Sequence, residues 1–270
     1  MANNIYALNK YTFIWRIGSM IKGGLTFSFV LLLFLIALYI ICIARAVRGK
    51  IPWIRRIPGL DAIDEAIGRA VETGRPIFYS TGVGDLSAAT MPQTMAGLTL
   101  LGYVARRAAE YKADFTYIAA VPQLVPIAED MIKTAYRDKY KPDQIMFVPS
   151  QTALMATVMG VYEREKPAAN FLLGALYWET IILAEAGARA GAIQVGGTGR
   201  LYQIPYIVAL CDYGLIGEEL LAAGAYVSRE PSQLGTILAS DIVRFIIIGL
   251  SVLAVVLGGL GIDLSSIFEF

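Results

Sequence analysis

Two long apolar runs frame the middle of this chain. Residues 25–44 form a run of 20 residues without a charge, and residues 245–262 form a second run of 18. A helix needs about 20 apolar residues to cross the hydrocarbon core of a bilayer. The pattern therefore predicts two transmembrane helices, one on each side of a central domain.

The first run has a competing interpretation as a cleaved signal peptide. A signal peptide has a shorter apolar region, of about 7–15 residues, and a small-residue cleavage site follows it. Here the basic sequence RAVRGK follows instead, which favours the transmembrane helix. Aromatic and basic residues alternate in residues 1–24, which predicts an interfacial segment on the bilayer or a plain aromatic belt beside the first span.

Residues 51–240 have the composition of a water-exposed domain, with 16 basic and 19 acidic residues. Short apolar runs rich in β-forming residues alternate there with helical patterns. Strands are predicted at residues 76–82, 114–121, 145–149, 170–176, 192–197 and 206–212. Apolar strands separated by helices are typical of a parallel sheet covered on both faces. We predict an α/β, Rossmann-like fold with a mostly parallel sheet and helices on both faces, flanked by the two transmembrane helices.

The last part of this domain leaves alternatives open. Only eight residues separate Gly197 from Tyr206, so we expect a hairpin or a flap there in place of a helix. The next helix is expected to begin after Asp212 and to run to about residue 227. Residues 171–183 and 206–225 are also apolar, but carboxylates interrupt them and are costly at the centre of a bilayer, which argues against further spans.

Composition narrows the classes of function. Hydrophobic residues make up 56% of the chain and charged residues 17%, which indicates that lipid solvates part of it. The net charge of +1 offers no basic face for nucleic acid. The chain has no histidine, which excludes His-ligated metals and His-based catalytic triads, and its two cysteines cannot form a zinc site alone. We expect membrane lipid as a partner, no nucleic acid and no metal site.

Basic residues predict the orientation in the membrane. Five of them lie just after the first apolar run and three before it, and Arg244 lies on the near side of the second run. Cytoplasmic flanks carry the excess of basic residues. We therefore expect a multi-pass protein of the cell membrane, with the central domain in the cytoplasm and both termini outside it.

Polar and glycine residues end the predicted strands, where ligands bind in open parallel sheets. The candidate ligand-binding residues are Gly82, Gly84, Asp85, Glu179, Gly196, Gly197, Thr198 and Asp212. If all strands are parallel, their carboxyl ends share one edge. We therefore expect Asp85, Glu179, Gly196 and Asp212 to lie near one another along that edge.

Each candidate also has a plain structural interpretation. The loop TGVGD stands where a phosphate-binding loop would, but the third glycine of the dinucleotide pattern is missing, and a tight turn explains its glycines as well. The segment GGTGR is either an anion site with Arg200 as the countercharge or a glycine-rich turn. Glu179 and Asp212 are either an acid–base or cation-binding pair, or acidic residues in a first helical turn.

Three stretches of the chain resemble a known family. These are GLDAIDEAIGRAVETGRPIFYSTGVGDL, LYWETIILAEAGARAGAIQVGGT and VALCDYGLIGEELLAAGAYVS. They are similar to the domain-of-unknown-function family 6754 of bacterial and archaeal membrane proteins, from residue 60 to the final span. The resemblance implies membrane anchorage and carries over no activity and no functional residue.

Two hypotheses about function remain. The first is a membrane-anchored α/β domain that acts as a self-associating scaffold or binding module, a homo-oligomer without assigned chemistry. Small residues that predict close helix contacts, within the domain or between copies, are Ala184, Gly187, Ala188 and Gly191. The alternative is a membrane-bound enzyme or nucleotide-responsive module that uses the strand ends, with its catalytic residues and cofactor unknown. Fold does not imply function, and we favour the non-enzymatic hypothesis.

Overall fold

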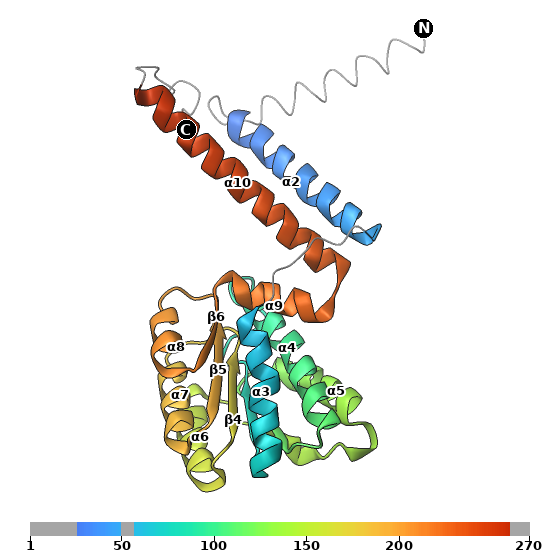
Figure 1. Ribbon diagram of the computed structural model, residues 1–270, viewed down its shortest axis with the longest axis vertical. Coiled ribbons are helices and arrows are strands. Elements are labelled where there is room, and N and C mark those ends of the chain that lie inside the picture. Colours follow the sequence, from blue (N-terminus) through green and yellow to red (C-terminus); the bar gives the residue numbers. More distant parts are fainter. Residues whose placement is uncertain (1–25, 50–56, 260–270) are drawn as a thin grey trace. The chain divides into compact units, whose positions relative to one another are not determined.

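The computed structural model describes residues 26–49 and 57–259, which form two compact units (Figure 1). One unit contains the helices α2 (Thr26–Val47) and α10 (Pro231–Gly259). The other is an α/β domain within Trp53–Glu230. The predicted interfacial segment, residues 1–24, lies outside the described residues, as do the last three residues of the second apolar run.

The helices α2 and α10 pack on each other as a hairpin through small residues. Both helices are long and apolar enough to cross a membrane, over Phe29–Val47 and Pro231–Gly259. A Cβ atom on Gly235 would lie 2.7 Å from the Cα atom of Ile43, so the two backbones touch there. The hydroxyls of Tyr39 and Ser240 form a hydrogen bond of 3.0 Å between the helices. Small residues at the contact allow this close approach, as in transmembrane helix pairs.

The domain is built on one sheet of six parallel strands in the order β3-β2-β1-β4-β5-β6. The strands are β1 (Ile77–Ser80), β2 (Phe115–Ala119), β3 (Ile145–Phe147), β4 (Ala169–Leu173), β5 (Ile193–Thr198) and β6 (Tyr213–Ile216). This is the strand order of dinucleotide-binding folds, and it confirms the predicted Rossmann-like α/β class. We call the side of the sheet where the strands end the carboxyl edge, and the side where they begin the amino edge.

Helices cover both faces of the sheet, as predicted (Figure 1). They are α3 (Pro58–Thr73), α4 (Met91–Glu110), α5 (Val125–Tyr136), α6 (Gln151–Glu165), α7 (Glu179–Ala190), α8 (Ile204–Leu210) and α9 (Glu218–Ser228). One apolar core lies between the sheet and α3, α4, α5 and α9, with Ile63, Leu101 and Leu220 fully buried. A second core lies under α6, α7 and α8, with Val158, Leu183 and Ile207 fully buried. The burial of both faces explains why the central strands are mostly apolar.

The prediction for the sixth strand was wrong. Residues 206–212 were expected to be a strand, but most of them belong to α8, whose first turn contains Pro205 and begins inside the short connection after β5. The strand itself is Tyr213–Ile216, which was expected to be helical. An apolar run such as YIVALC fits a buried strand and a short helix equally well, so its hydrophobic pattern does not distinguish them. The connection is therefore a helical crossover, and β6 is parallel to β5.

Both chain connections of the α/β domain leave from the carboxyl edge. The last residues of α3 lead directly into β1 at the amino edge, so its first residues lie at the other edge, where Gly59 packs on Leu215 of β6. After β6, α9 crosses α4 near its start, with Gly224 beside Ala96. The described part of the α/β domain thus begins and ends on the same side of its sheet.

Candidate functional site

The carboxyl edge is where a ligand of this fold would be expected. The direction of the strand order reverses between β1 and β4, and in open α/β sheets ligands bind in the crevice at that position. The loops that follow β1, β4 and β5 meet here. Gly82, Gly84, Asp85 and Glu179 are all placed at this edge, as predicted.

Three backbone amides of the glycine loop after β1 donate to acceptors within the domain. In a phosphate-binding loop such amides point at the ligand. Here the amide of Gly82 donates to Ser80 Oγ, at 3.2 Å, and the amide of Gly84 donates to the carbonyl oxygen of Ala175, at 3.2 Å. The amide between them, on Val83, donates to the Oε1 atom of Glu179 at 3.2 Å. The loop therefore presents no free amide of these three to a ligand.

The same loop packs tightly on the loop after β4. A Cβ atom on Gly84 would lie 2.2 Å from the Cβ atom of Ala175, and one on Gly82 would lie 2.8 Å from Leu176 Cδ2. Gly82 also has a positive φ of 76°, which favours glycine. The two glycines thus serve a close contact between loops, and protein atoms fill the position of the crevice.

Glu179 is fully buried and connects three loops. Its Oε1 atom accepts hydrogen bonds from the amides of Val83 and Tyr177, at 3.2 and 3.1 Å. Its Oε2 atom accepts from Gln151 Nε2 at 2.6 Å. As the first residue of α7, the carboxylate also lies at the positive end of a helix dipole. Glu179 therefore places a carboxylate at a helix N-terminus, where negative groups are stabilised.

Asp85 is exposed and organises its own loop. Its Oδ1 atom accepts from the amide of Ser87 at 3.0 Å and from Thr90 Oγ1 at 2.6 Å. Hydrogen bonds from the side chains of Ser87 and Thr90 lower the pKa of Asp85 to about 2. A carboxylate with so low a pKa is a weak base, so it is poorly suited to general base catalysis near neutral pH.

The residues at the start of α4 contact two loops. Thr90 precedes the helix and donates its hydroxyl to Asp85, without a side-chain capping bond to α4. Gln93 accepts from the amide of Gly199 at 3.2 Å. The start of α4 is thus tied to the loop after β5.

Gly196, Gly197 and Thr198 are the last three residues of β5. A Cβ atom on Gly196 would lie 2.6 Å from Cys211 Sγ, and one on Gly197 would lie 2.8 Å from Leu173 Cδ2. These glycines make room for packing on the two faces of the sheet. Only Gly199 and Arg200 of the GGTGR segment lie in the loop, so the segment does not form the predicted glycine-rich turn.

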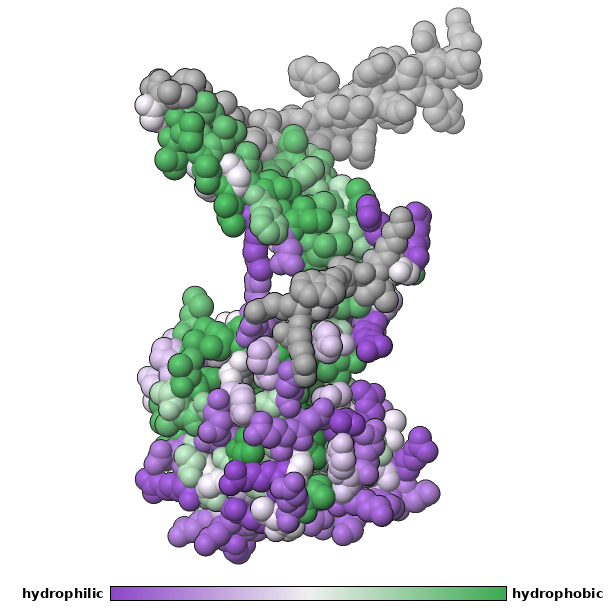
Figure 2. Space-filling view, viewed as in Figure 1, coloured by the Kyte–Doolittle hydropathy of each residue, from purple (hydrophilic) through white to green (hydrophobic). Residues whose placement is uncertain are grey.

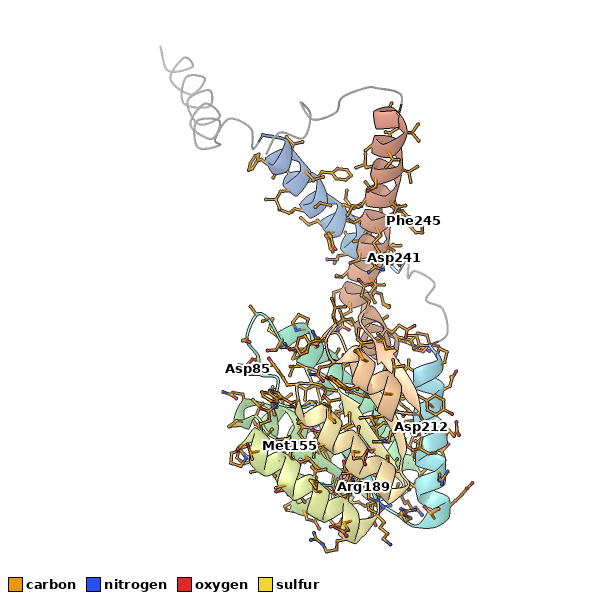
Figure 3. The ribbon with its side chains drawn as sticks, turned by 90° about the vertical axis from the view of Figure 1, so that its left-hand side faces the viewer. Asp85, Met155, Arg189, Asp212, Asp241 and Phe245 are labelled. Atoms are coloured by element: carbon orange, nitrogen blue, oxygen red, sulfur yellow. The ribbon has the colours of Figure 1, made fainter. Side chains whose placement is uncertain are left out.

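Asp212 lies at the amino edge, which corrects the prediction that four candidates share one edge. It precedes β6, and its Oδ2 atom accepts from the amide of Gln194 at 2.8 Å. Figure 3 shows Asp85 and Asp212 well apart on the domain. Because the sixth strand begins after Asp212, this carboxylate cannot pair with Glu179. Beside it, burial and the charge of Asp212 raise the pKa of the Cys211 thiol to about 12, which makes the thiol a poor nucleophile.

Small residues on α7 turn out to serve contacts within the domain. Ala184 is fully buried. A Cβ atom on Gly187 would lie 2.3 Å from Gln194 Oε1, which shows that this face of α7 packs on β4 and β5. Ala188 is exposed. These small residues were expected to make close contacts either within the domain or between copies. Ala184 and Gly187 make contacts within the domain.

Sequence reasoning missed a group of exposed side chains at the carboxyl edge. We call Trp178, Leu201 and Tyr202 the carboxyl-edge patch; they are 74%, 82% and 55% exposed. Arg200 lies between them, with its guanidinium carbon 3.8 Å from the ring centroid of Tyr177 and hydrogen bonds to the hydroxyls of Tyr177 and Tyr202. The sequence does contain a signal for this patch, because the aromatic residues YW follow β4 and the segment RLY follows β5.

The two ends of the domain differ in the hydropathy of their surfaces. Figure 2 shows hydrophobic residues over α8 and the loop before it, and mainly hydrophilic residues at the opposite end of the domain. At the amino edge a depression of about 1240 Å³ is lined by side chains of both signs, including Arg106, Asp114 and Lys141. Among the described residues, no group of three or more Cys, Asp and Glu side chains could hold a metal ion.

Comparison with known proteins identifies the family. A family model with the description "Domain of unknown function (DUF6754)" covers residues 18–268. Neither the curated proteins nor the solved structures yield a match to this chain.

Proposed function

The chain belongs to the DUF6754 family, whose description gives no activity, and we propose from its geometry that it is a membrane-anchored, self-associating scaffold. In this proposal α2 and α10 cross the cell membrane and hold the α/β domain in the cytoplasm. The domain binds other protein surfaces, copies of itself included, and performs no chemistry at its strand ends.

The filled crevice at the carboxyl edge carries this proposal. An enzyme or nucleotide-binding module of this fold needs free amides and space after β1. Here the carboxylate of Glu179 and the carbonyl of Ala175 already accept from the loop amides. A phosphate in the same place would meet a buried negative charge, which would repel it.

The carboxyl-edge patch supports protein binding. Large apolar side chains exposed together mark interaction surfaces, and Trp, Tyr and Arg are the residue types that dominate binding energy at interfaces. Trp178, Tyr202 and Arg200 supply these three types on two neighbouring loops.

The oligomeric state of the full chain tests the proposal. We expect cross-linking in native membranes, and mass analysis in lipid nanodiscs, to detect assemblies of more than one copy. Leu201→Ser and Trp178→Ser should reduce cross-linking between α/β domains several-fold. Met159→Ser on α6, where the side chain is 50% exposed, is the matched control and should leave it unchanged. A chain that is monomeric in both settings contradicts the scaffold.

A nucleotide-responsive module is the second candidate, and buried polar atoms favour it. Among the described residues, Thr94 Oγ1, Arg200 Nε and Gln203 Oε1 are buried without a hydrogen-bond partner. Thr94 belongs to the start of α4 and the other two to the loop after β5. A ligand that pairs with these atoms should raise the melting temperature of the full chain in detergent. Screening with nucleotides, sugars and divalent cations tests this, and a failure of all of them to stabilise the protein would remove the candidate.

A further inference from the structure

We propose that Asp241 and Arg244 of α10 lie inside the hydrocarbon of the bilayer and pair there with Arg244 and Asp241 of a second copy of this chain. The inference rests on the membrane anchorage and self-association proposed above. It adds the surface through which two hairpins meet.

The packing of the hairpin fixes which residues of α2 and α10 share a level. Tyr39 is opposite Ser240, and Ile43 is opposite Gly235. The numbering runs in opposite directions on the two helices. Two residues beyond Tyr39 on α2 therefore correspond to two residues before Ser240 on α10, which places Ile41 level with Leu238.

With the helices aligned in this way, the exposed apolar surface of α2 and that of α10 are offset from each other along the hairpin. On α2 the continuous exposed apolar surface extends as far as Ile40 and Ile41, which are 61% and 55% exposed, and Val47, 64% exposed, stands apart from it beyond Arg45. On α10 the surface begins at Phe245, 76% exposed, and continues to Val256, 53% exposed. From Leu238, the level of Ile41, to Val256 is a rise of about 27 Å, at about 1.5 Å per residue. That distance matches the hydrocarbon thickness of about 30 Å, so a single bilayer covers both surfaces at once.

This placement puts two charged residues inside the bilayer. Counted from the level of Ile41, Asp241 lies about 4.5 Å and Arg244 about 9 Å into the slab. Figure 3 shows Asp241 and Phe245 close together along α10, where the charged and apolar parts of the helix meet. The two charges pair with each other at 3.3 Å, yet their side chains stay 51% and 45% exposed. Exposed charge in hydrocarbon is costly, and such residues usually face a protein partner.

A second copy of the chain is the occupant that suits both charges. An anionic lipid headgroup would attract Arg244 but repel Asp241. A long Arg side chain can also reach toward the interface, whereas the short Asp side chain cannot. A two-fold dimer brings the same surface of two copies together, so residue i meets residue j and j meets i. Each Asp241 then meets an Arg244, and each Arg244 meets an Asp241.

Charge reversal in the full chain tests this pairing. The variant Asp241→Lys carries two positive charges at the site, and Arg244→Glu carries two negative charges. Each variant alone should self-associate about tenfold less than the wild type in nanodiscs. When the two variants carry different tags and are expressed together, they should form mixed dimers that either tag recovers. Rescue by mixing would also show that both variants insert and fold.

The exposed pair Glu185–Arg189 on α7 is the matched control, because it has the same charges at 2.9 Å outside the membrane helices. Glu185→Lys and Arg189→Glu should leave association unchanged. The neutral double variant Asp241→Asn with Arg244→Gln inserts more easily and should also associate less than the wild type.

The outcomes separate this inference from the proposed function. A monomeric wild type overturns both. A wild type that assembles, together with charge variants and a neutral variant that assemble equally well and show no preference for mixed dimers, overturns only the pairing at Asp241 and Arg244. In that case lipid headgroups or water cover the two charges, and the copies meet elsewhere.

Discussion

The Glu179 carboxylate lies at the carboxyl edge, the side of the sheet where open α/β folds bind their ligands. It accepts from the amides of Val83 and Tyr177 and from the side chain of Gln151, so the loops after β1, β3 and β4 all depend on it. Each of these donors is part-buried and would lose its acceptor if the carboxylate were removed. Buried donors without an acceptor destabilise a protein by about 1–3 kcal/mol each.

We therefore expect Glu179→Ala to lower the free energy of unfolding by about 2–5 kcal/mol. Glu179→Gln should lower it much less, because the amide oxygen keeps one acceptor and the Gln151 side chain can rotate to present its own oxygen. Chemical denaturation of the full chain in detergent, followed by tryptophan fluorescence, measures both. Glu185→Ala, on the same helix with a side chain that is 47% exposed, is the control. If Glu179→Ala unfolds at the same denaturant concentration as that control, Glu179 does not hold the three loops.

At the scale of elements, the contact between α4 and β4 depends on glycine. A Cβ atom on Gly97 would lie 2.2 Å from the carbonyl oxygen of Leu173, a backbone atom that cannot move aside easily. Gly160 in α6 has no atom within 4 Å of such a Cβ position. The same substitution should therefore have opposite effects at the two sites.

We expect Gly97→Ala to destabilise the chain by about 1–3 kcal/mol, since overpacking forces the helix away from the sheet. Gly160→Ala should stabilise it by about 0.5–1 kcal/mol, because alanine loses less backbone entropy in a helix. Unfolding curves of the two variants, compared with the wild type, give the sign directly. Equal effects at both positions would argue against the close approach of α4 to β4.

The sequence predicts elements well where local signals agree. An acidic residue in a first helical turn was one interpretation of Glu179, and α7 does begin there and ends before Gly191, which has a positive φ. For residues 206–212 the local signals conflict, since β-branched residues favour a strand while Pro205 suits the first turn of a helix. That one ambiguity moved Asp212 from one edge of the sheet to the other.

The candidate site was harder to predict than the fold. Glycine spacing indicated correctly that a tight loop follows β1, but it did not reveal what the loop amides bind. Glu179, which accepts from the amide of Val83, is separated from it by 96 positions in the chain. Local patterns report backbone conformation, whereas the acceptor for a buried amide depends on which distant elements the sheet brings together.

For the whole molecule, the proposed anchorage makes a prediction about sidedness. A reporter fused at Phe270 should face away from the cytoplasm, while one inserted near Lys141 should face it. The physical reason is the excess of basic residues between the first apolar run and the α/β domain. Protease protection and compartment-specific reporters measure the two positions. Both reporters in the cytoplasm would mean that α10 does not cross the membrane.

The α/β domain begins and ends at the same edge of its sheet, which has a consequence for protein engineering. The α/β domain begins at α3 and ends at α9 on one side of its sheet, so it is an insertion within the turn of a helical hairpin. Insertions whose two ends leave from one side are readily transplanted, because the host needs only a short gap to receive them. The domain can therefore be treated as a transplantable insertion. A short flexible linker in its place would leave the sequences of α2 and α10 intact as a minimal hairpin.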